Sequence, residues 1–449
     1  MNSSMRAGDL ADATPSTRDR YVDLLRAFSI FVVVVGHWLM AVVYLTDGRL
    51  TGANALDLVP GLWILTWVLQ VMPLFFFVGG FANRVAWKGT VARGEGYGAF
   101  LRARTARLMR PTFVFVAVWT AAAVVARILA PASFDSVAEA TELLAKPLWF
   151  LAVYTLVVAL SPLMLALHER YGARVLVALV STAVVVDVIR IAFDLTAVGY
   201  LNFATVWLFA HQLGYFYGDG ALLAFSRKVF VGTAVGALVL LALLTGSGIY
   251  SPSMVGMVTE AASNNSPPTI CLMVLTVWLT SAALIVRPYF VRKLESRRTW
   301  SAVIAANSMI MTVFLWHLTA LLIAVVALYP LGFPQAEGGS ALWWAWRPVW
   351  LGVLTIILSG LVAVFARFER PKADAVRGSK HVEVSAPSVA AGVAALVLGL
   401  AGFATSGFAI APAAPTLGTA LAHPVVNLVL VYVGYRALAR RANNAGGER

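Results

Sequence analysis

The sequence predicts an all-α polytopic membrane protein, and three observations lead to that fold class. Hydrophobic residues make up 60% of the 449 residues, charged residues only 12%, and the mean hydropathy is +0.82. A soluble chain would carry about a quarter charged residues, so lipid must be the solvent for most of this one. The apolar residues run in long unbroken blocks, which excludes a membrane β-barrel because barrel strands alternate apolar and polar residues.

Apolar blocks near the ~20 residues that a spanning helix needs follow one another along the chain. They fall at 22–45, 58–82, 111–130, 148–167, 175–192, 201–217, 229–249, 268–286, 302–329, 348–366, 389–411 and 424–437. The fifth block ends in Asp187 and Arg190, and the twelfth is short. We therefore expect about eleven or twelve spans, with ten remaining possible.

The positive charge is sorted by side. With the N-terminus inside and the sides alternating, 29 of the 34 Lys and Arg residues fall in inside segments. The five outside cations are Arg49, Arg127, Lys146, Arg190 and Arg347. This asymmetry follows the positive-inside rule, so the net charge of +13 encodes orientation and attraction to anionic lipid, and no nucleic-acid partner is expected.

The ends and linkers of the chain complete the predicted organisation. We expect a cytoplasmic tail at 1–20, a membrane domain at 21–368, a cytoplasmic linker at 369–388, further spanning helices at 389–437 and a cytoplasmic tail at 438–449. The polar start and the long first apolar block favour a retained helix over a cleaved signal peptide. Arg outnumbers Lys 28 to 6, which is typical of a GC-rich bacterial source, so we expect the bacterial cytoplasmic membrane.

The single cysteine and the aromatic outer segment carry less chemistry. Cys271 lies alone in an apolar block, so the sequence indicates no disulfide, no thiol redox pair and no metal site. The segment 342–350 contains four tryptophans. We interpret it as an interfacial aromatic belt, with a sugar-stacking platform as the alternative.

The first apolar block contains ionisable residues on one face. Arg26 and His37 are eleven residues apart, which on a helix is about three turns and a rise of about 16 Å, and Asp23 falls near the same stripe. We expect His37 at about mid-membrane, where a histidine without a partner is costly and can move a proton near neutral pH. His37 is therefore a candidate catalytic residue, with helix packing as the alternative.

Four arginines precede the third apolar block, in the segment FLRARTARLMRP. They are Arg102, Arg104, Arg107 and Arg110. Guanidinium groups bind phosphate in a bidentate manner, so we interpret this loop as a site for a polyanionic cytosolic ligand, with a stop-transfer anchor as the alternative.

Other polar or irregular positions lie deep in apolar blocks. Pro73 and the pair Gly79–Gly80 predict either an interrupted helix lining a cavity or close helix packing. His211 and His317 are candidates for a pore or an acceptor site.

Together these features resemble the membrane-bound acyltransferase 3 family over roughly residues 20–368. The family's Arg-x10-His element matches Arg26 and His37, and its Arg-x-x-Arg element fits Arg104 with Arg107 or Arg107 with Arg110. FFFVGGF resembles its second helix, with Gly79 where a serine is common. PLWFLAVY, which contains Trp149, and FLWHLT, which contains Trp316 and His317, resemble later family helices.

The resemblance implies a core of about ten helices with one or two extra C-terminal spans, and an O-acyltransferase activity. The donor would be cytosolic acyl-CoA, most simply acetyl-CoA, with no tightly bound cofactor. The acceptor would be a hydroxyl of a sugar, glycolipid or cell-envelope polysaccharide. His37 would act as general base or carry the acyl group, Arg26 would orient the donor and Asp23 would position Arg26. The four arginines would bind the donor, and Trp149, Trp316, His211 and His317 are possible acceptor-site residues.

The alternative is a twelve-helix proton-coupled transporter or exporter of a sugar or lipid. The loop after the sixth block is only about ten residues long, whereas a major-facilitator protein has a long central loop there. Neither half carries the loop motif typical of that class, so the acyltransferase is the favoured interpretation.

Overall fold

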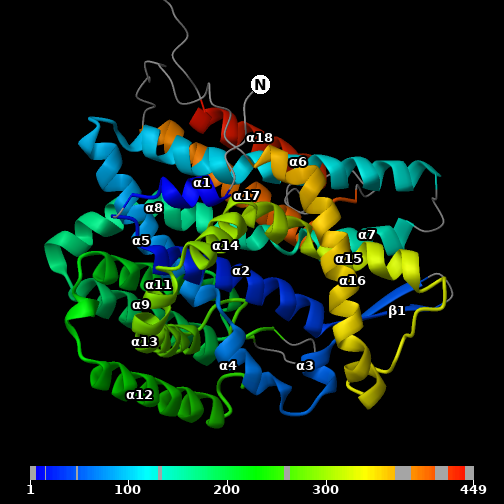
Figure 1. Ribbon diagram of the computed structural model, residues 1–449, viewed down its shortest axis with the longest axis horizontal. Helices are drawn as coiled ribbons and strands as arrows, with labels where there is room; N and C mark the ends of the chain where they lie inside the picture. Colours follow the sequence, from blue (N-terminus) through cyan, green and yellow to red (C-terminus); the bar gives the residue numbers. More distant parts are fainter. Residues whose placement is uncertain are drawn as a thin grey trace, which may run out of the picture.

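The computed structural model describes residues 7–15, 17–46, 49–129, 134–256, 263–369, 386–409 and 423–439. Within them the chain is a bundle of helices with one two-stranded hairpin (Figure 1). The longer helices are α2 Arg20–Met40, α5 Met72–Ala92, α6 Tyr97–Leu129, α8 Leu148–Tyr171, α9 Arg174–Ala192, α11 Asn202–Gly218, α12 Arg227–Gly246, α13 Ile270–Lys293, α15 Ile310–Leu328, α16 Ala341–Phe365, α17 Ala386–Ser406 and α18 Pro424–Ala439. The shorter elements are α1 Ala7–Asp12, α3 Ala55–Leu58, α4 Thr66–Leu69, α7 Phe134–Ala145, α10 Thr196–Gly199, α14 Arg297–Ser308, the strands β1 Ala41–Thr46 and β2 Arg49–Asn54, and three 3-10 turns at 62–65, 222–224 and 366–368.

The chain is an all-α polytopic membrane protein. Among the described helices, ten are long and apolar enough to cross a membrane. The other two apolar blocks form α11, with 17 residues, and α18, with 16 residues. Each of the twelve blocks thus contains a helix, while a total of eleven or twelve spans stays a prediction.

The first apolar block does not form one helix, contrary to expectation. Asp19 caps α2 by accepting hydrogen bonds from the backbone N–H groups of Tyr21 and Val22, at 2.9 and 3.1 Å. The helix ends at Met40, and the β-branched and aromatic run that follows pairs with β2 as an antiparallel hairpin. His37 therefore lies in the last turn of α2 rather than at its middle.

The second block breaks before Pro73, not at its glycines. A 3-10 turn at 62–65 leads into α4, which ends at Leu69, and α5 then runs without interruption through Gly79 and Gly80. Gly80 faces α11, where a Cβ would lie 1.9 Å from the carbonyl oxygen of His211, and a Cβ on Gly79 would lie 3.2 Å from the ring of Tyr154 on α8. Close helix packing is therefore the reason for the glycine pair.

The arginine-rich segment is not a loop. It forms the first half of α6, a 33-residue helix that continues through Pro111. The tryptophan-rich outer segment is likewise helical, because Trp343 to Trp350 lie in the first turns of α16. Trp343 and Trp350 are buried, so neither forms an open sugar-stacking platform.

Described parts of the predicted N-terminal tail and of the predicted linker belong to the folded structure. Residues 7–12 form α1, which packs on α14 through a bidentate ion pair between Asp12 and Arg297. This hydrogen bonding holds the pKa of Asp12 below its ordinary value. Glu369 is buried, and its carboxylate accepts hydrogen bonds from the N–H groups of Met311 and Thr312, which caps α15. Residues 370–385 of the predicted linker and 440–449 of the predicted tail lie outside the described residues.

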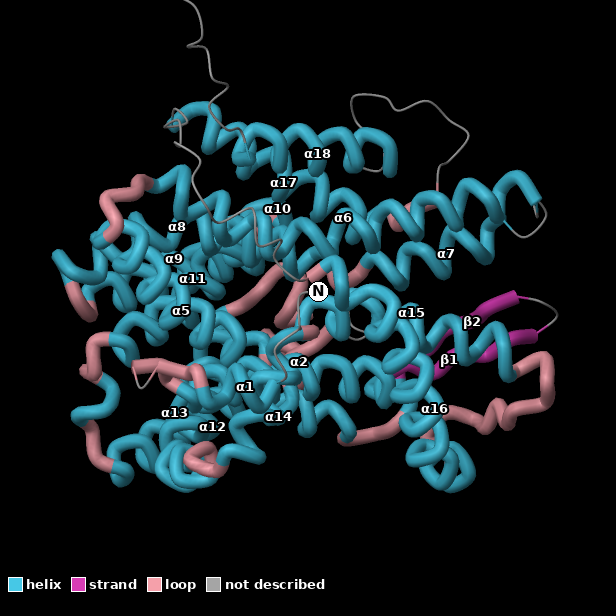
Figure 2. Tube along the Cα trace, turned by 45° about the horizontal axis from the view of Figure 1, so that its top comes forward, coloured by secondary structure: helices cyan, strands magenta, loops and turns pink. Residues whose placement is uncertain are grey.

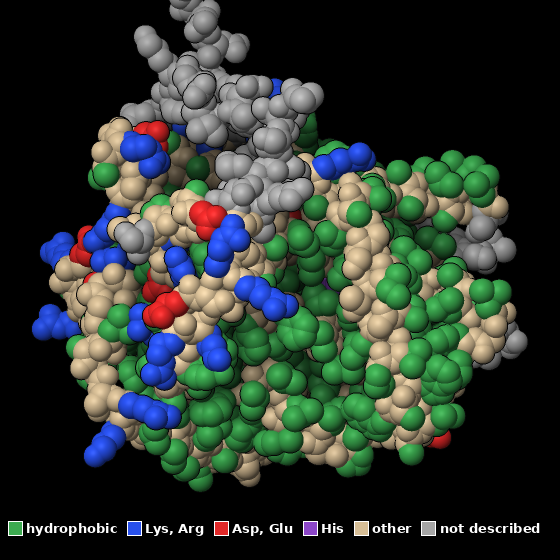
Figure 3. Space-filling model, in the orientation of Figure 1, with side chains coloured by type: hydrophobic (Ala, Val, Ile, Leu, Met, Phe, Trp, Pro, Cys, Tyr) green, Lys and Arg blue, Asp and Glu red, His purple; other side chains and the backbone are tan. Residues whose placement is uncertain are grey.

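The C-terminal helices pack on the rest of the bundle. Helix α17 contacts α18, α7 and α8, and α18 contacts α6 (Figure 2). On the face drawn in Figure 3, most Lys and Arg side chains gather at the end opposite the β1–β2 hairpin, and hydrophobic side chains cover the rest. We call the end where the Lys and Arg side chains gather the basic end, and the opposite end, which carries β1 and β2, the hairpin end.

Candidate active site

Helices α2 and α15 bring two histidines into contact. His37 Nδ1 lies 2.9 Å from His317 Nε2, and the two rings are stacked with centroids 5.0 Å apart. His317 is fully buried. The indole N–H of Trp38 donates to the carbonyl oxygen of His317 at 2.9 Å, which fixes the two helices against each other.

The hydrogen bonds around this pair assign its protons. His317 Nδ1 lies 2.6 Å from the carbonyl oxygen of Phe314, and a carbonyl oxygen only accepts, so Nδ1 of His317 carries a hydrogen. In a neutral His317, Nε2 is then an acceptor, and Nδ1 of His37 must donate to it. Nε2 of a neutral His37 is left with a free lone pair, which is what a base or a nucleophile needs.

Arg26 is paired with Asp23, three residues earlier on α2. Asp23 Oδ1 accepts from Arg26 Nη1 at 3.2 Å, and its other oxygen accepts from Arg18 Nε at 2.7 Å. Asp23 is buried, and its backbone carbonyl accepts from the amide of Asn307 on α14. The carboxylate therefore fixes the guanidinium of Arg26 at the basic end of α2.

A second polar chain joins α5, α6 and α11. Arg104 donates through Nε and Nη2 to Asn83 Oδ1, with the Nε bond at 2.8 Å. The amide of Asn83 lies 3.0 Å from His211 Nε2. Asn83 and His211 are both fully buried. Asn83 and His211 thus hold Arg104, one arginine of the predicted donor site, through hydrogen bonds.

These two chains belong to one electrostatic group. Arg26, Arg104 and Arg107 lie near enough for their charges to act on one another, and Tyr154 of α8 lies near both Arg26 and Arg104. Arg107 is exposed. The structure therefore brings together the Arg104 and Arg107 register of the predicted Arg-x-x-Arg element.

The other two arginines of the predicted donor site, Arg102 and Arg110, are not part of this group. Arg102 lies near Glu95, and its Nη1 is buried without a hydrogen-bond partner. Arg110 is partly buried, and no hydrogen bond or ion pair is described for it.

Aromatic side chains lie between the histidine pair and the arginines. Phe314 contacts His317, Phe150 contacts Phe314, and Tyr154 contacts Phe150, with ring centroids 6.1, 5.3 and 5.7 Å apart. Arg26 and His37 are separated by about 16 Å along α2. Phe314, Phe150 and Tyr154 thus form an aromatic wall. The guanidinium of Arg26 lies at one end of it, and the ring of His37 lies at the other.

Of the predicted acceptor-site residues, only His317 joins His37. Trp316 stacks on Phe365 at 3.8 Å, because neighbouring residues on a helix point about 100° apart. Trp149 packs near Trp207. His211 lies with Arg104 instead, so these three residues do not form one site with the histidine pair.

The sequence interpretation missed Asn83, Tyr154 and Glu369. Asn83 had a usable signal, since it is a lone amide at the end of an apolar block. Tyr154 lies in the family-like segment PLWFLAVY, whereas Glu369 had no signal, because its role depends on a helix that is distant in sequence.

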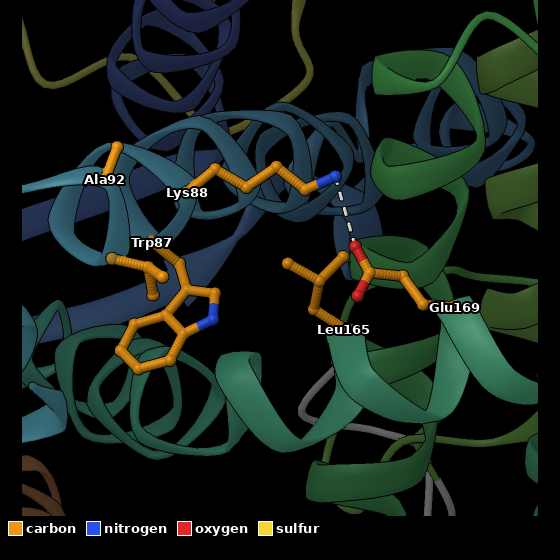
Figure 4. A pocket seen from close by; sticks show the side chains of 6 residues that line it. Trp87, Lys88, Ala92, Leu165 and Glu169 are labelled. Atoms are coloured by element: carbon orange, nitrogen blue, oxygen red, sulfur yellow. Dashed lines mark ion pairs between the residues drawn. The ribbon is translucent and has the colours of Figure 1, made fainter. Parts of the chain in front are cut away.

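Two cavities flank the site. One of about 200 Å³ lies at the hairpin end, lined by Val43, Thr51, Glu139, Leu321 and Val325 among others. Leu321 is one helical turn from His317. The other, of about 350 Å³, lies between the C-terminal ends of α5 and α8, where Figure 4 shows Lys88 directed at Glu169, 3.1 Å away.

The fold is that of a multi-pass membrane protein, and α2 and α15 bring His37 and His317 together about 16 Å along α2 from Arg26. A family model described as an acyltransferase domain, Acyl_transf_3, matches residues 19–368. The match covers more than half of the chain, so the chain belongs to the acyltransferase 3 family and is a membrane acyltransferase. No curated protein and no solved structure matches the chain.

Proposed function

We propose that this protein transfers a short acyl group, most simply acetyl, from cytosolic acyl-CoA to a hydroxyl of a sugar, glycolipid or cell-envelope polysaccharide. Acyl transfer follows from the family; the donor, the acceptor and the residue roles are the proposal. The observation that carries it is the hydrogen-bonded order Phe314, His317, His37, which leaves His37 Nε2 unprotonated.

In the proposed reaction His37 Nε2 accepts the proton of the acceptor hydroxyl. The hydroxyl oxygen attacks the thioester carbonyl, the carbon–sulfur bond breaks, and the thiolate takes the proton back from His37 as CoA–SH. A neutral Nε2 also permits attack by His37 itself, which gives an acyl-imidazole that the acceptor then cleaves. Both routes need the same tautomer, so His317 is a positioning residue in either.

The donor would lie along the aromatic wall. A CoA thioester is long, with phosphates at one end and the reactive carbonyl at the other, and the site has the matching order. Arg26, Arg104 and Arg107 would bind the phosphates at the basic end, where planar guanidinium groups offer paired donors. The basic end would face the cytosol of the bacterial cytoplasmic membrane, with the N-terminus on the same side.

The acceptor would enter from the opposite side. The cavity of about 200 Å³ at the hairpin end lies one helical turn beyond His317 and combines apolar side chains with one exposed carboxylate, Glu139. A hydroxyl entering through it would meet His37 from the side away from the arginines.

A His37→Ala variant tests the proposed function in cells. We expect normal membrane insertion and complete loss of one acyl mass from glycolipids or surface polysaccharides, as in a deletion strain, measured by comparative mass spectrometry. His423→Ala, outside the matched range, serves as the control and should keep the modification. If the glycolipids and polysaccharides of the His37→Ala strain keep the acyl group, the proposal is wrong.

A further inference from the structure

The hairpin end contains an arginine whose charge is not neutralised by any described carboxylate. Arg347 lies in the first turns of α16, and its Nε and Nη1 are buried without a hydrogen-bond partner. Its guanidinium lies over the ring of Trp343, 4.0 Å from the centroid. This cation–π contact fixes the side chain but leaves the N–H groups available.

The other four cations predicted on the outer side of the membrane differ from Arg347 in their surroundings. Lys146 pairs with Glu142 at 2.7 Å, and Arg190 lies 4.0 Å from Asp187. Arg127 has an electrostatic or hydrogen-bond partner of its own, and the side chain of Arg49 is not described. Arg347, in contrast, has no ion pair with a described carboxylate.

Two tyrosines lie beside Arg347. Tyr44 of β1 packs against the cluster that contains Trp343, and Tyr329 at the end of α15 stacks on Trp350 of α16, with ring centroids 5.8 Å apart. The hydroxyl of Tyr44 accepts from the N–H of Gly338 at 2.8 Å, so its own hydrogen remains free to donate. No hydrogen bond is described for the hydroxyl of Tyr329. Two N–H groups of Arg347 and two phenol hydroxyl groups that can donate, with no described carboxylate among them, suit an oxyanion.

We propose that Arg347, Tyr44 and Tyr329 bind a carboxylate or phosphate group carried by the acceptor molecule. Buried N–H groups without a partner are costly, and an anion with two or more oxygens satisfies them with strong charge-assisted bonds. Arg347 is partly exposed, so part of its side chain reaches the surface, while Nε and Nη1 are buried. Tyr329 is twelve residues beyond His317 on α15, about 18 Å along the helix, so one end of an extended acceptor binds here while a hydroxyl reaches His37.

The claim that the anionic group belongs to the acceptor rests on the proposed function. The claim that Arg347 and the two tyrosines bind an anion does not. Binding is therefore measured without turnover. The full-length protein is reconstituted in phosphatidylcholine nanodiscs, and its thermal unfolding is followed with glucuronate, with inorganic phosphate, and with glucose as the sugar that lacks a carboxylate.

We expect glucuronate and phosphate, but not glucose, to raise the unfolding temperature of the wild type and of His37→Ala. Arg347→Gln should weaken this binding at least about tenfold, because a charge-assisted pair is lost. Tyr329→Phe removes one hydroxyl without a described bond, so it should fold normally and weaken binding about threefold or more. Lys146→Gln, which removes a cation that is already paired, should leave binding unchanged.

An unchanged response in both Arg347→Gln and Tyr329→Phe would overturn the site. Competition between glucuronate and added phosphatidylglycerol, lost in Arg347→Gln, would support the site but assign it to a lipid headgroup rather than the acceptor. Loss of acyl transfer in His37→Ala with anion binding retained separates this proposal from the proposed function.

Discussion

His317 differs from the other membrane histidines in what its two ring nitrogens do. One donates to a backbone carbonyl, and the other accepts a hydrogen bond from Nδ1 of His37. His211, by contrast, bonds to an amide and leaves its Nδ1 buried without a partner. Only the first arrangement forces a tautomer on a neighbouring base.

Replacing His317 tests this role. His317→Leu cannot hold His37 in the tautomer with a free Nε2, so kcat should fall about 100-fold or more with little change in the KM for acyl-CoA. His317→Gln can donate to Phe314 and accept from His37, so it should recover a substantial part of kcat. Equal kcat in His317→Leu and the wild type would contradict a positioning role.

The arginines in the first half of α6 are also expected to differ in their roles. Arg104→Ala with Arg107→Ala should weaken CoA binding about tenfold or more, since two phosphate-binding guanidinium groups are lost. Arg110→Ala on the same helix is the matched control and should bind CoA normally. Isothermal titration with the purified protein measures both. Normal CoA binding by the double variant would contradict a role in donor binding and leave these arginines only a role in orienting the protein in the membrane.

At the scale of elements, the crossing of α5 and α11 depends on glycine. Gly80 and Gly214 face each other, and a Cβ on Gly214 would lie 2.1 Å from the carbonyl oxygen of Phe77. This close approach brings Asn83 to His211 one turn further along α5. The crossing therefore positions the chain that anchors Arg104.

Gly80→Ala tests the crossing. The added methyl group forces the helices apart, which should cost about 1–3 kcal/mol and lower the unfolding temperature of the purified protein. Gly236→Ala on α12 has no neighbouring atom within 4 Å and should leave the temperature unchanged or raise it slightly. Equal unfolding temperatures for the two variants would refute the packing account.

Helix α15 depends on a residue that the sequence interpretation assigned to a linker. Glu369 supplies the carboxylate for the first N–H groups of α15, and Phe365 of the preceding turn stacks on Trp316. The end of α16 thus fixes the start of the helix that carries His317. A charged residue just after an apolar block is usually solvated, so nothing in the sequence distinguished this one.

At the scale of the whole molecule, the sorting of charge predicts the orientation. Cys271 is the single cysteine and is buried, so a Cys271→Ser background allows new cysteines to be labelled one at a time. With a membrane-impermeant maleimide, Glu337→Cys should react in intact cells and Glu295→Cys only after lysis. Both glutamates are exposed. The reverse pattern would contradict the positive-inside assignment.

The sequence predicts the helical blocks well, because burial in lipid requires long apolar runs. It predicts His37, Arg26 and Asp23 on one stripe, because they share a helix. It does not predict the β1–β2 hairpin, where an apolar strand continues an apolar helix, nor the contact between His37 and His317, which are 280 residues apart. Contacts of that kind depend on how the helices pack, and periodicity within one helix carries no information about it.

The most direct test of the central claim is label transfer by purified protein in nanodiscs. Wild type, His37→Ala and His317→Gln are incubated with acetyl-labelled acetyl-CoA and a cell-envelope extract, and both the labelled acceptor and released CoA thiol are measured. We predict equal amounts of product and thiol with the wild type, reduced amounts with His317→Gln, and none with His37→Ala although CoA still binds. Wild-type transfer by His37→Ala would contradict the account.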